Sequence, residues 1–399
     1  MSRIMQNTQN SRIASIDIFR ALTMFMMIFV NDFWTLSDIP EWLGHAKTHE
    51  DRMGLSDWVF PGFLFIVGLS IPFAIKARKK KGEAQIQIFW HIIKRSLALI
   101  IMGFFMVNLE NITSDLLPFS KYIWQLLMAT AIVFIWNIYP NQKAFKRIPE
   151  WVMQLTGISI LVFLSIVYKG GTVEDPSWMK PHWWGILGII GWAYLLCATI
   201  YLFIGERILY VGIVWIVFHV LNVMEFKEIF GMPIHINLMV SSSNHTSVMG
   251  GVLTTLLYIK YGKRHQIPVF LGIIFVMAVL SIVYGFITRP EWGISKIKAT
   301  PSWTSICIGI SMLSFSLIYI ISDVLGKISW ASIFAPAGRS TLTCYLVPYF
   351  YYPVMMLIGI FLPEALKTGF IGIVKSLLFA YLIIYMTGLL EKVSIRLKV

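Results

Sequence analysis

The chain has 399 residues, of which 57% are hydrophobic and 13% are charged, and its formal net charge is +13. This composition is too apolar for a set of soluble domains and is typical of a polytopic helical membrane protein. In a soluble protein the positive charge would suggest nucleic acid. Here the basic residues lie in short loops between apolar segments, so membrane topology explains them and no nucleic-acid partner is expected.

The apolar runs predict an all-α transmembrane bundle of about twelve spans, forming a single integral-membrane domain over residues 1–399. The polar residues 1–15 precede the first run without a small-residue cleavage site, so we expect an uncleaved first span. The expected spans are 17–34, 58–76, 88–107, 121–139, 151–168, 184–204, 207–224, 247–261, 268–288, 304–323, 341–362 and 371–390.

Loops between these spans alternate in charge. Basic loops on one side contain Arg3, Arg12, Lys76, Arg78, Lys79, Lys80, Lys81, Lys143, Lys146, Arg147, Lys260, Lys263, Arg264, Lys392, Arg396 and Lys398. By the positive-inside bias, both termini are cytoplasmic and the loop holding His45 is extracytoplasmic. The segment 289–303 is an exception, because Arg289, Lys296 and Lys298 fall on the outer side.

The first two spans carry polar residues at their ends. Asp17 and Arg20 open the first span, Asn31 and Asp32 end it, and Asp57 opens the second. Asp17 and Arg20 are three residues apart and share one helical face, where they can pair. Hydrocarbon makes such groups costly, so they should face one another or a water-filled cavity.

The loop between these spans holds His45, His49, Glu50 and Asp51 and is followed by Asp57. Histidine takes and returns a proton near neutral pH, and a carboxylate can fix its tautomer and stabilise the imidazolium. The loop is therefore a candidate catalytic site; the alternative is a pair of solvated loop histidines.

The first two predicted spans and the loop between them contain five short motifs: D-x-F-R, F-V-N, aromatic-x-x-H-A, G-L-x-D and V-F-P-x-F-x-F-I-x-G. They stand at 17–20, 29–31, 42–46, 54–57 and 59–68. In these motifs the chain resembles the transmembrane acyltransferase family that includes heparan-alpha-glucosaminide N-acetyltransferase.

The resemblance leaves two candidates for the catalytic histidine. The aromatic-x-x-H-A context selects His45, whereas the family's lysosomal branch places the histidine five residues before the glycine of G-L, which selects His49. A small loop insertion explains the difference. We favour His45, because sequence context outlasts loop length, and keep His49 as the alternative.

The resemblance implies that an acetyl group passes from cytoplasmic acetyl-CoA, a co-substrate, to an extracytoplasmic amino sugar or glycan. The histidine would act as general base or as transient acyl carrier. Asp57 would orient it, and Asn31 would donate a hydrogen bond to the thioester carbonyl or its oxyanion. A thioester is already activated, so neither a metal nor a tightly bound cofactor is expected.

The phosphates of CoA need positive charge on the cytoplasmic side. Lys79, Lys80 and Lys81 are candidates, with Arg20 deeper in the membrane. The same lysine run is also explained as a topology signal.

Two other functions fit twelve spans with both ends inside: a secondary transporter of a small solute, and an O-acyltransferase of surface polysaccharide. The short loops suggest a bacterial inner membrane, and a homo-oligomer is possible. Cys197, Cys307 and Cys344 all fall inside apolar spans, so buried thiols are expected.

Overall fold

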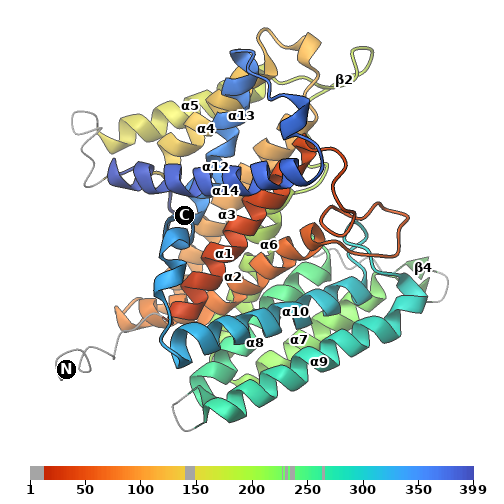
Figure 1. The fold of residues 1–399 in the computed structure, drawn as a ribbon. Helices are drawn as coiled ribbons and strands as arrows, with labels where there is room; N and C mark the ends of the chain where they lie inside the picture. The colour runs from red at the N-terminus through yellow and green to blue at the C-terminus, as the bar shows by residue number, and fades with distance from the viewer. Residues whose placement is uncertain (1–12, 140–148, 227, 230–231, 234–238, 263–265) are drawn as a thin grey trace. The chain divides into compact units, whose positions relative to one another are not determined.

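The computed structural model describes residues 13–139, 149–226, 228–229, 232–233, 239–262 and 266–399 (Figure 1). The basic residues Arg3, Arg12, Lys143, Lys146, Arg147, Lys263 and Arg264 lie outside these ranges. The described chain is mainly helical and forms two compact units, each assembled from separate parts of the sequence. The single domain over 1–399 stays a prediction.

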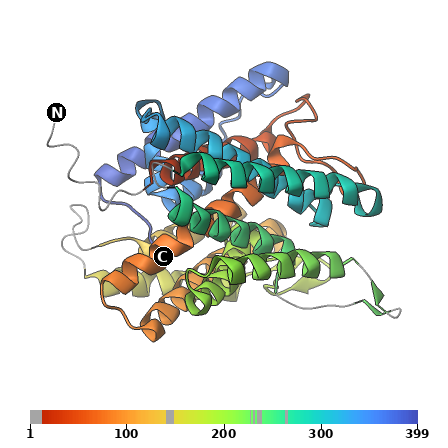
Figure 2. The same cartoon turned by 90° about the horizontal axis from the view of Figure 1, so that it is seen from below.

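Unit 1 comprises Pro40–Ile92, Ala193–Arg339 and the described residues up to Met27. Figure 1 shows α7 beside α8 and α9 beside α10, and Figure 2 shows the same helices from below. Its elements are most of α1 (Ala14–Asn31), α2 (Leu55–Lys80), the start of α3 (Gln85–Glu110), the end of α6 (Gly185–Ile204), α7 (Ile208–Met224), β3 (Glu228–Ile229), β4 (Met232–Pro233), α8 (Ser242–Tyr261), α9 (Ile267–Trp292), α10 (Pro301–Tyr319), the π-helix η3 (Ile320–Val324), η4 (Ser329–Phe334) and α11 (Ala335–Arg339).

Helix α8 is the buried helix of unit 1, packed against α2, α7, α9 and α10. Glycines let it approach α2 closely: a Cβ on Gly68 would collide with the backbone of Val248, and one on Gly251 with the backbone of Phe65. Small residues at helix interfaces permit this approach in membrane proteins. Helix α2, which carries Asp57 at its start, is thereby fixed along its length.

The polar run at 241–247 forms the start of α8, five residues before the predicted span. Ser241 is the N-cap and accepts from the backbone N–H of Ser243, as in a conventional cap. Glu225 accepts from the hydroxyl of Ser241 at 2.7 Å and from the N–H of Ser242 at 2.6 Å. The run is therefore a buried, capped helix start.

Unit 2 comprises Ile28–Ile39, Ile93–Trp192 and Ser340–Val399. Buried Trp124 of α4 packs on Phe105 and Tyr168 and donates to the carbonyl of Leu164 on α5. The elements of unit 2 are η1 (Asp32–Thr35), most of α3 and the start of α6, η2 (Ser114–Leu116), α4 (Lys121–Trp136), α5 (Glu150–Val167), β1 (Gly170–Gly171), β2 (Pro176–Ser177), α12 (Thr341–Leu346), α13 (Pro348–Leu357), η5 (Glu364–Leu366) and α14 (Gly369–Lys392).

Unit 2 also holds a buried ion pair between Asp32 of η1 and Lys375 of α14, at 2.6 Å. The Asp32 side chain is 2% exposed and that of Lys375 is 16% exposed. Tyr352 donates to one carboxylate oxygen at 2.6 Å, Ser376 donates to the other, and Lys375 also donates to the hydroxyl of Thr35. The carboxylate and the ammonium are both satisfied, as burial requires.

By length and composition, eight of the described helices could cross a membrane; α4 and α7 are shorter apolar helices. The chain is therefore a helical membrane protein. The predicted number of twelve spans and the cytoplasmic placement of the termini stay predictions. Helix α8 is less apolar than these helices, because its first turns are rich in serine and threonine.

The segment predicted as one span, 341–362, is an interrupted helix that ends at Leu357. The structure has two short helices, α12 and α13, that meet at Val347. Pro348 has no N–H to donate to the preceding turn, and its ring disfavours a continuous helix. The second helix ends at Leu357, and Gly359 follows with a φ of 70°.

We predict that Lys375→Met destabilises the protein by about 3–5 kcal/mol, because it leaves the Asp32 carboxylate buried without a counter-charge. The double variant Asp32→Asn/Lys375→Met should be milder, since no charge is left unpaired. Thermal unfolding in detergent measures both. Lys367→Met, which removes an exposed pair with Glu364, is the control and should shift stability by no more than about 1 kcal/mol. Equal melting of the single and double variants would contradict the prediction.

Candidate active site

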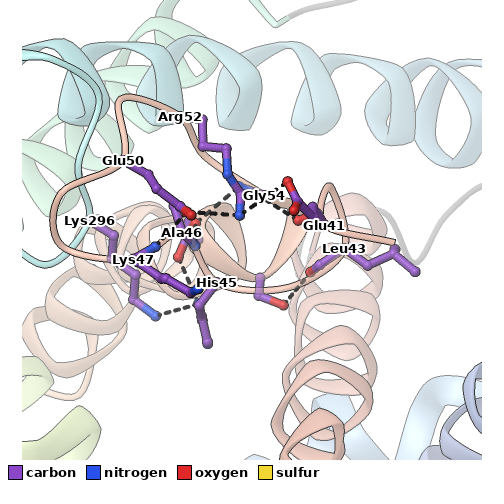
Figure 3. Close-up of polar contacts among 11 residues, drawn as sticks. Glu41, Leu43, His45, Ala46, Lys47, Glu50, Arg52, Gly54 and Lys296 are labelled. Carbon is purple, nitrogen blue, oxygen red and sulfur yellow. Dashed lines mark hydrogen bonds and ion pairs between the residues drawn. The ribbon is translucent and has the colours of Figure 1, made fainter. Parts of the chain in front are cut away.

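The histidine loop, residues 40–54, is hydrogen-bonded to the start of α2. The N–H of Leu55 donates to the carbonyl of Trp42 at 2.7 Å, and the N–H of Ser56 donates to the carbonyl of Leu43 at 3.1 Å. The hydroxyl of Ser56 donates to the same Leu43 carbonyl (Figure 3). These bonds hold residues 42 and 43 against the helix and so fix the position of His45.

Asp57 lies in the first turn of α2, and its side chain is 1% exposed. One carboxylate oxygen accepts from the backbone N–H groups of Ala46 and Gly54, each at 3.0 Å. The other lies 2.7 Å from Nδ1 of His45. Three donors and the positive end of the helix dipole compensate the burial of this carboxylate.

His45 meets Asp57 through Nδ1, and its side chain is 48% exposed. An ionised carboxylate can only accept, so Nδ1 is the nitrogen that donates to Asp57, and in the neutral ring Nε2 is the nitrogen with the lone pair. The ring is thus held in the tautomer that can take a proton or attack a carbonyl at Nε2. The structure brings together the pair that the sequence proposed.

His49 is exposed, and both oxygens of Asp57 are occupied by other donors. It belongs to a different part of the loop, where Glu50 accepts from the N–H of Lys47 at 2.9 Å and pairs with Arg52 at 2.8 Å. The Lys47 N–H, with help from Arg52, lowers the pKa of Glu50 although burial opposes the shift. The geometry favours His45 over His49 as partner of Asp57.

Asp51 fastens the histidine loop to the segment between α9 and α10. Its carboxylate accepts from the N–H of Ile294 at 2.6 Å and from Nε of Arg289 at 2.9 Å, and its carbonyl accepts from the same guanidinium. Burial opposes ionisation, but the Ile294 N–H and Arg289 outweigh it and lower the pKa of Asp51 below 3.8. The contribution of this clamp to stability is therefore present above about pH 4 and is lost as pH falls through the lowered pKa.

This segment brings Lys296 to the site. Its Nζ lies 3.2 Å from Nδ1 of His45, and Figure 3 shows the side chain extending toward the imidazole. The sequence did not identify Lys296 as a site residue. The available signal was that 289–303 broke the predicted alternation of charge between loops. In the structure Arg289 pairs with Asp51 and Lys296 contacts His45, so these two charges belong to the candidate site.

The remaining predicted site residues lie elsewhere. Arg20 pairs with Asp17 at 2.9 Å, as predicted, and also donates to the hydroxyl of Ser70 on α2 at 2.7 Å. Asn31 is exposed at the end of α1 and belongs to unit 2, whereas His45 and Asp57 belong to unit 1. The run Lys79–Lys81 is exposed at the other end of α2 from Asp57.

Cys197, Cys307 and Cys344 are buried free thiols, as predicted. Among the described residues, no group of three or more His, Cys, Asp or Glu side chains is arranged to hold a metal ion.

We predict that Gly54→Ala disrupts the histidine loop, because a Cβ at this position would collide with the backbone carbonyl of Gly44. The loop would have to move away from α2, so the temperature of thermal unfolding in detergent should fall. The control is Gly62→Ala on the same helix, where the new Cβ meets only the Trp58 ring at 3.4 Å. Equal effects of the two variants would contradict this account of the loop.

Comparison with known proteins identifies the segment that carries this site. Residues 12–182 match the family model described as heparan-alpha-glucosaminide N-acetyltransferase, catalytic. The match includes α1, the histidine loop and α2, and it ends before Lys296.

Two curated relatives carry the same name. The mouse heparan-alpha-glucosaminide N-acetyltransferase is 30% identical over 180 residues, covering 39% of this chain and 26% of the relative. The human protein is 31% identical over 101 residues, covering 24% of this chain and 14% of the relative. The chain thus matches about a quarter or less of each relative's length. The family resemblance read from the five motifs is confirmed: the part of the chain that holds His45 and Asp57 is similar to the catalytic region of heparan-alpha-glucosaminide N-acetyltransferases.

Proposed function

We propose that this protein is a transmembrane acyltransferase that moves an acetyl group from cytoplasmic acetyl-CoA to an amino sugar or glycan on the far side of the membrane. The observation that carries the proposal is the 2.7 Å contact between His45 and buried Asp57 within the segment that matches the catalytic family model. The relatives' name supports N-acetyl transfer to a glucosaminide as the model reaction.

His45 can act by either of two routes through Nε2. In direct transfer, Nε2 takes a proton from the acceptor nitrogen as that nitrogen bonds to the thioester carbon; the C–S bond breaks and the CoA sulfur receives the proton. In two-step transfer, Nε2 itself attacks the thioester carbon and CoA leaves as a thiolate. The acceptor nitrogen then attacks the acetyl-imidazole, the C–N bond to the ring breaks, and the proton of the acceptor nitrogen goes to the thiolate. Asp57 serves both routes, because it keeps the proton on Nδ1 and stabilises positive charge on the ring.

Two other residues complete the proposed chemistry. Asn31 is the candidate donor to the oxyanion, assigned by its position in the F-V-N motif. Trp42 is 66% exposed, three residues before His45, and offers a ring face on which a sugar can stack. An aromatic residue at the membrane interface is the alternative explanation for Trp42.

Helix α2 connects the two ends of the proposed reaction. It has 26 residues, about 39 Å, with Asp57 near its start and Lys79 and Lys80 at its end. This length exceeds the hydrocarbon core of a bilayer, about 30 Å. We therefore propose that the lysine run attracts the phosphates of CoA at one surface, whereas Arg20, bonded to Ser70 of α2, lies deeper along the donor path.

The proposal places the protein in a bacterial inner membrane, with a homo-oligomer as a further possibility. A hydroxyl acceptor on a surface polysaccharide would use the same histidine chemistry. The competing class is a secondary transporter, which would yield no acetylated product from labelled acetyl-CoA with a broad panel of amino-sugar and polysaccharide acceptors.

We predict that His45→Ala lowers acetyl transfer by about 100-fold or more, because a general base or acyl carrier is lost. Asp57→Asn should lower it less, since a misoriented ring retains some function. His49→Ala, the matched control in the same loop, should be mild. Transfer from radiolabelled acetyl-CoA is measured beside CoA binding, so that a folding defect is separated from a chemical one.

Two results would contradict this assignment. An inactive His49→Ala with an active His45→Ala would show that the spacing to Gly54 was the better guide. Full activity of both variants would remove histidine catalysis in this loop from the mechanism.

A second prediction concerns the donor. Replacing Lys79, Lys80 and Lys81 by Gln should raise the apparent KM for acetyl-CoA with little change in kcat, because the lysines would act on phosphates far from the reacting carbon. The effect should weaken as salt screens the charges. An unchanged KM, with the protein inserted normally, would leave the run as a topology signal only.

A further inference from the structure

We propose that Lys296 is a positioning residue for His45. Its positive charge offsets the negative charge of Asp57, so that the imidazole stays unprotonated and free to act at Nε2. The inference rests on the proposed function of His45. It starts from the 3.2 Å contact between Nζ of Lys296 and Nδ1 of His45, a residue pair separated by 251 positions in the chain.

The carboxylate creates the need for such a charge. An anion 2.7 Å from the ring favours the imidazolium, which has no lone pair left to take a proton. The same anion is needed to fix the tautomer. A cation beside the pair resolves the conflict, because it opposes protonation of the ring while Asp57 still orients it.

The geometry at Nδ1 fits this role. A lysine ammonium only donates and a carboxylate only accepts, so one ring nitrogen cannot bond to both in the same tautomer. The shorter contact belongs to Asp57, at 2.7 Å against 3.2 Å for Lys296. Lys296 therefore acts on the ring through its charge and leaves the proton on Nδ1.

The segment that carries Lys296 is fastened to the histidine loop. Asp51 holds both Arg289 and the N–H of Ile294, two residues before Lys296. Within the segment, the hydroxyl of Thr300 donates to the carbonyl of Gly293 and accepts from the N–H of Ser295. Lys296 itself is partly buried, and this burial lowers its pKa while the charge of Asp57 opposes the shift. Its place beside His45 is thus built into the loop.

The other charged groups near the pair are accounted for. On α10, the buried Cys307 thiol interacts electrostatically with Lys296 and Asp57. In the histidine loop, Arg52 pairs with Glu50, and Asp51 pairs with Arg289. The Glu50 carboxylate accepts a hydrogen bond from the backbone N–H of Lys47, and the Lys47 charge also interacts with this carboxylate. Within the described part of the chain, Asp57 and Lys296 are the charged groups in hydrogen-bond distance of the His45 ring.

The experiment measures the protonation of His45 without relying on catalysis. Diethyl pyrocarbonate modifies the unprotonated imidazole, and peptide mass spectrometry follows His45 and His49 separately from about pH 5 to about pH 8, the range in which histidine changes charge. Asp51 stays ionised throughout this range, so the loop clamp does not change. Exposed His49 serves as an internal control in every variant.

Lys296→Met should move the pH of half-modification of His45 upward by about one to three units, because no neighbouring positive charge then opposes protonation of the ring. Lys296→Gln, which keeps a donor without the charge, should behave like Met. Lys296→Arg should restore the wild-type profile, and Lys298→Met, which removes an exposed lysine from the same segment, should leave it unchanged. The acid limb of kcat/KM should move with the His45 profile.

Superimposable His45 profiles for the wild type and Lys296→Met, or failure of Lys296→Arg to restore the profile, would overturn the inference. The labelling separates this failure from failure of the proposed function. If the profiles shift as expected but His45→Ala remains active, the charge effect stands and histidine catalysis is wrong.

Discussion

The buried carboxylate of Asp57 is the constraint on which the candidate site depends. A carboxylate that is 1% exposed at a helix start is tolerated only when donors surround it, and the chain supplies His45 and the N–H groups of Ala46 and Gly54. All three of these donors come from the histidine loop, so satisfying the charge folds the loop onto α2. The close approach of Gly54 to Gly44 follows from the same requirement. One buried charge thus sets the loop, the ring orientation and the tautomer.

Most of the fold that surrounds this charge could be predicted from the sequence. Long apolar runs gave the positions of most helices, because hydrocarbon forces backbone groups to bond within each segment. The interruption within 341–362 was not predicted, because Pro348 was counted as part of an apolar run although its missing N–H favours a break. The helix start at 242–246 was missed because Glu225 and Ser241 satisfy polar groups that hydropathy alone excludes from a span.

The candidate site was predictable only where its residues are close in sequence. His45 and Asp57 are twelve positions apart and lie within recognisable motifs. Asp51 and Arg289 are 238 positions apart, and Asp32 and Lys375 are 343 apart, so nothing local links either pair. The charges at 289–303 did carry information: basic residues that depart from the predicted charge pattern of the loops need a partner or a task. Here the partner of Arg289 is Asp51, and we propose that the task of Lys296 is to keep the His45 ring unprotonated.

The two buried carboxylates among the described residues, Asp32 and Asp57, are both satisfied by hydrogen bonds, but their partners differ in what they leave exposed. At Asp32, Lys375, Tyr352 and Ser376 occupy the oxygens, and Lys375 is bonded in turn to Thr35. Such a closed network holds a structure together but offers no group to a substrate, and it gives a transporter no charge that is easily released. At Asp57 the oxygens are also occupied, yet the bond to His45 leaves Nε2 on a side chain that is 48% exposed. The same physical demand, to pair a buried charge, therefore produces a closed network in one unit and, in the other, the imidazole nitrogen that we propose as the reactive group.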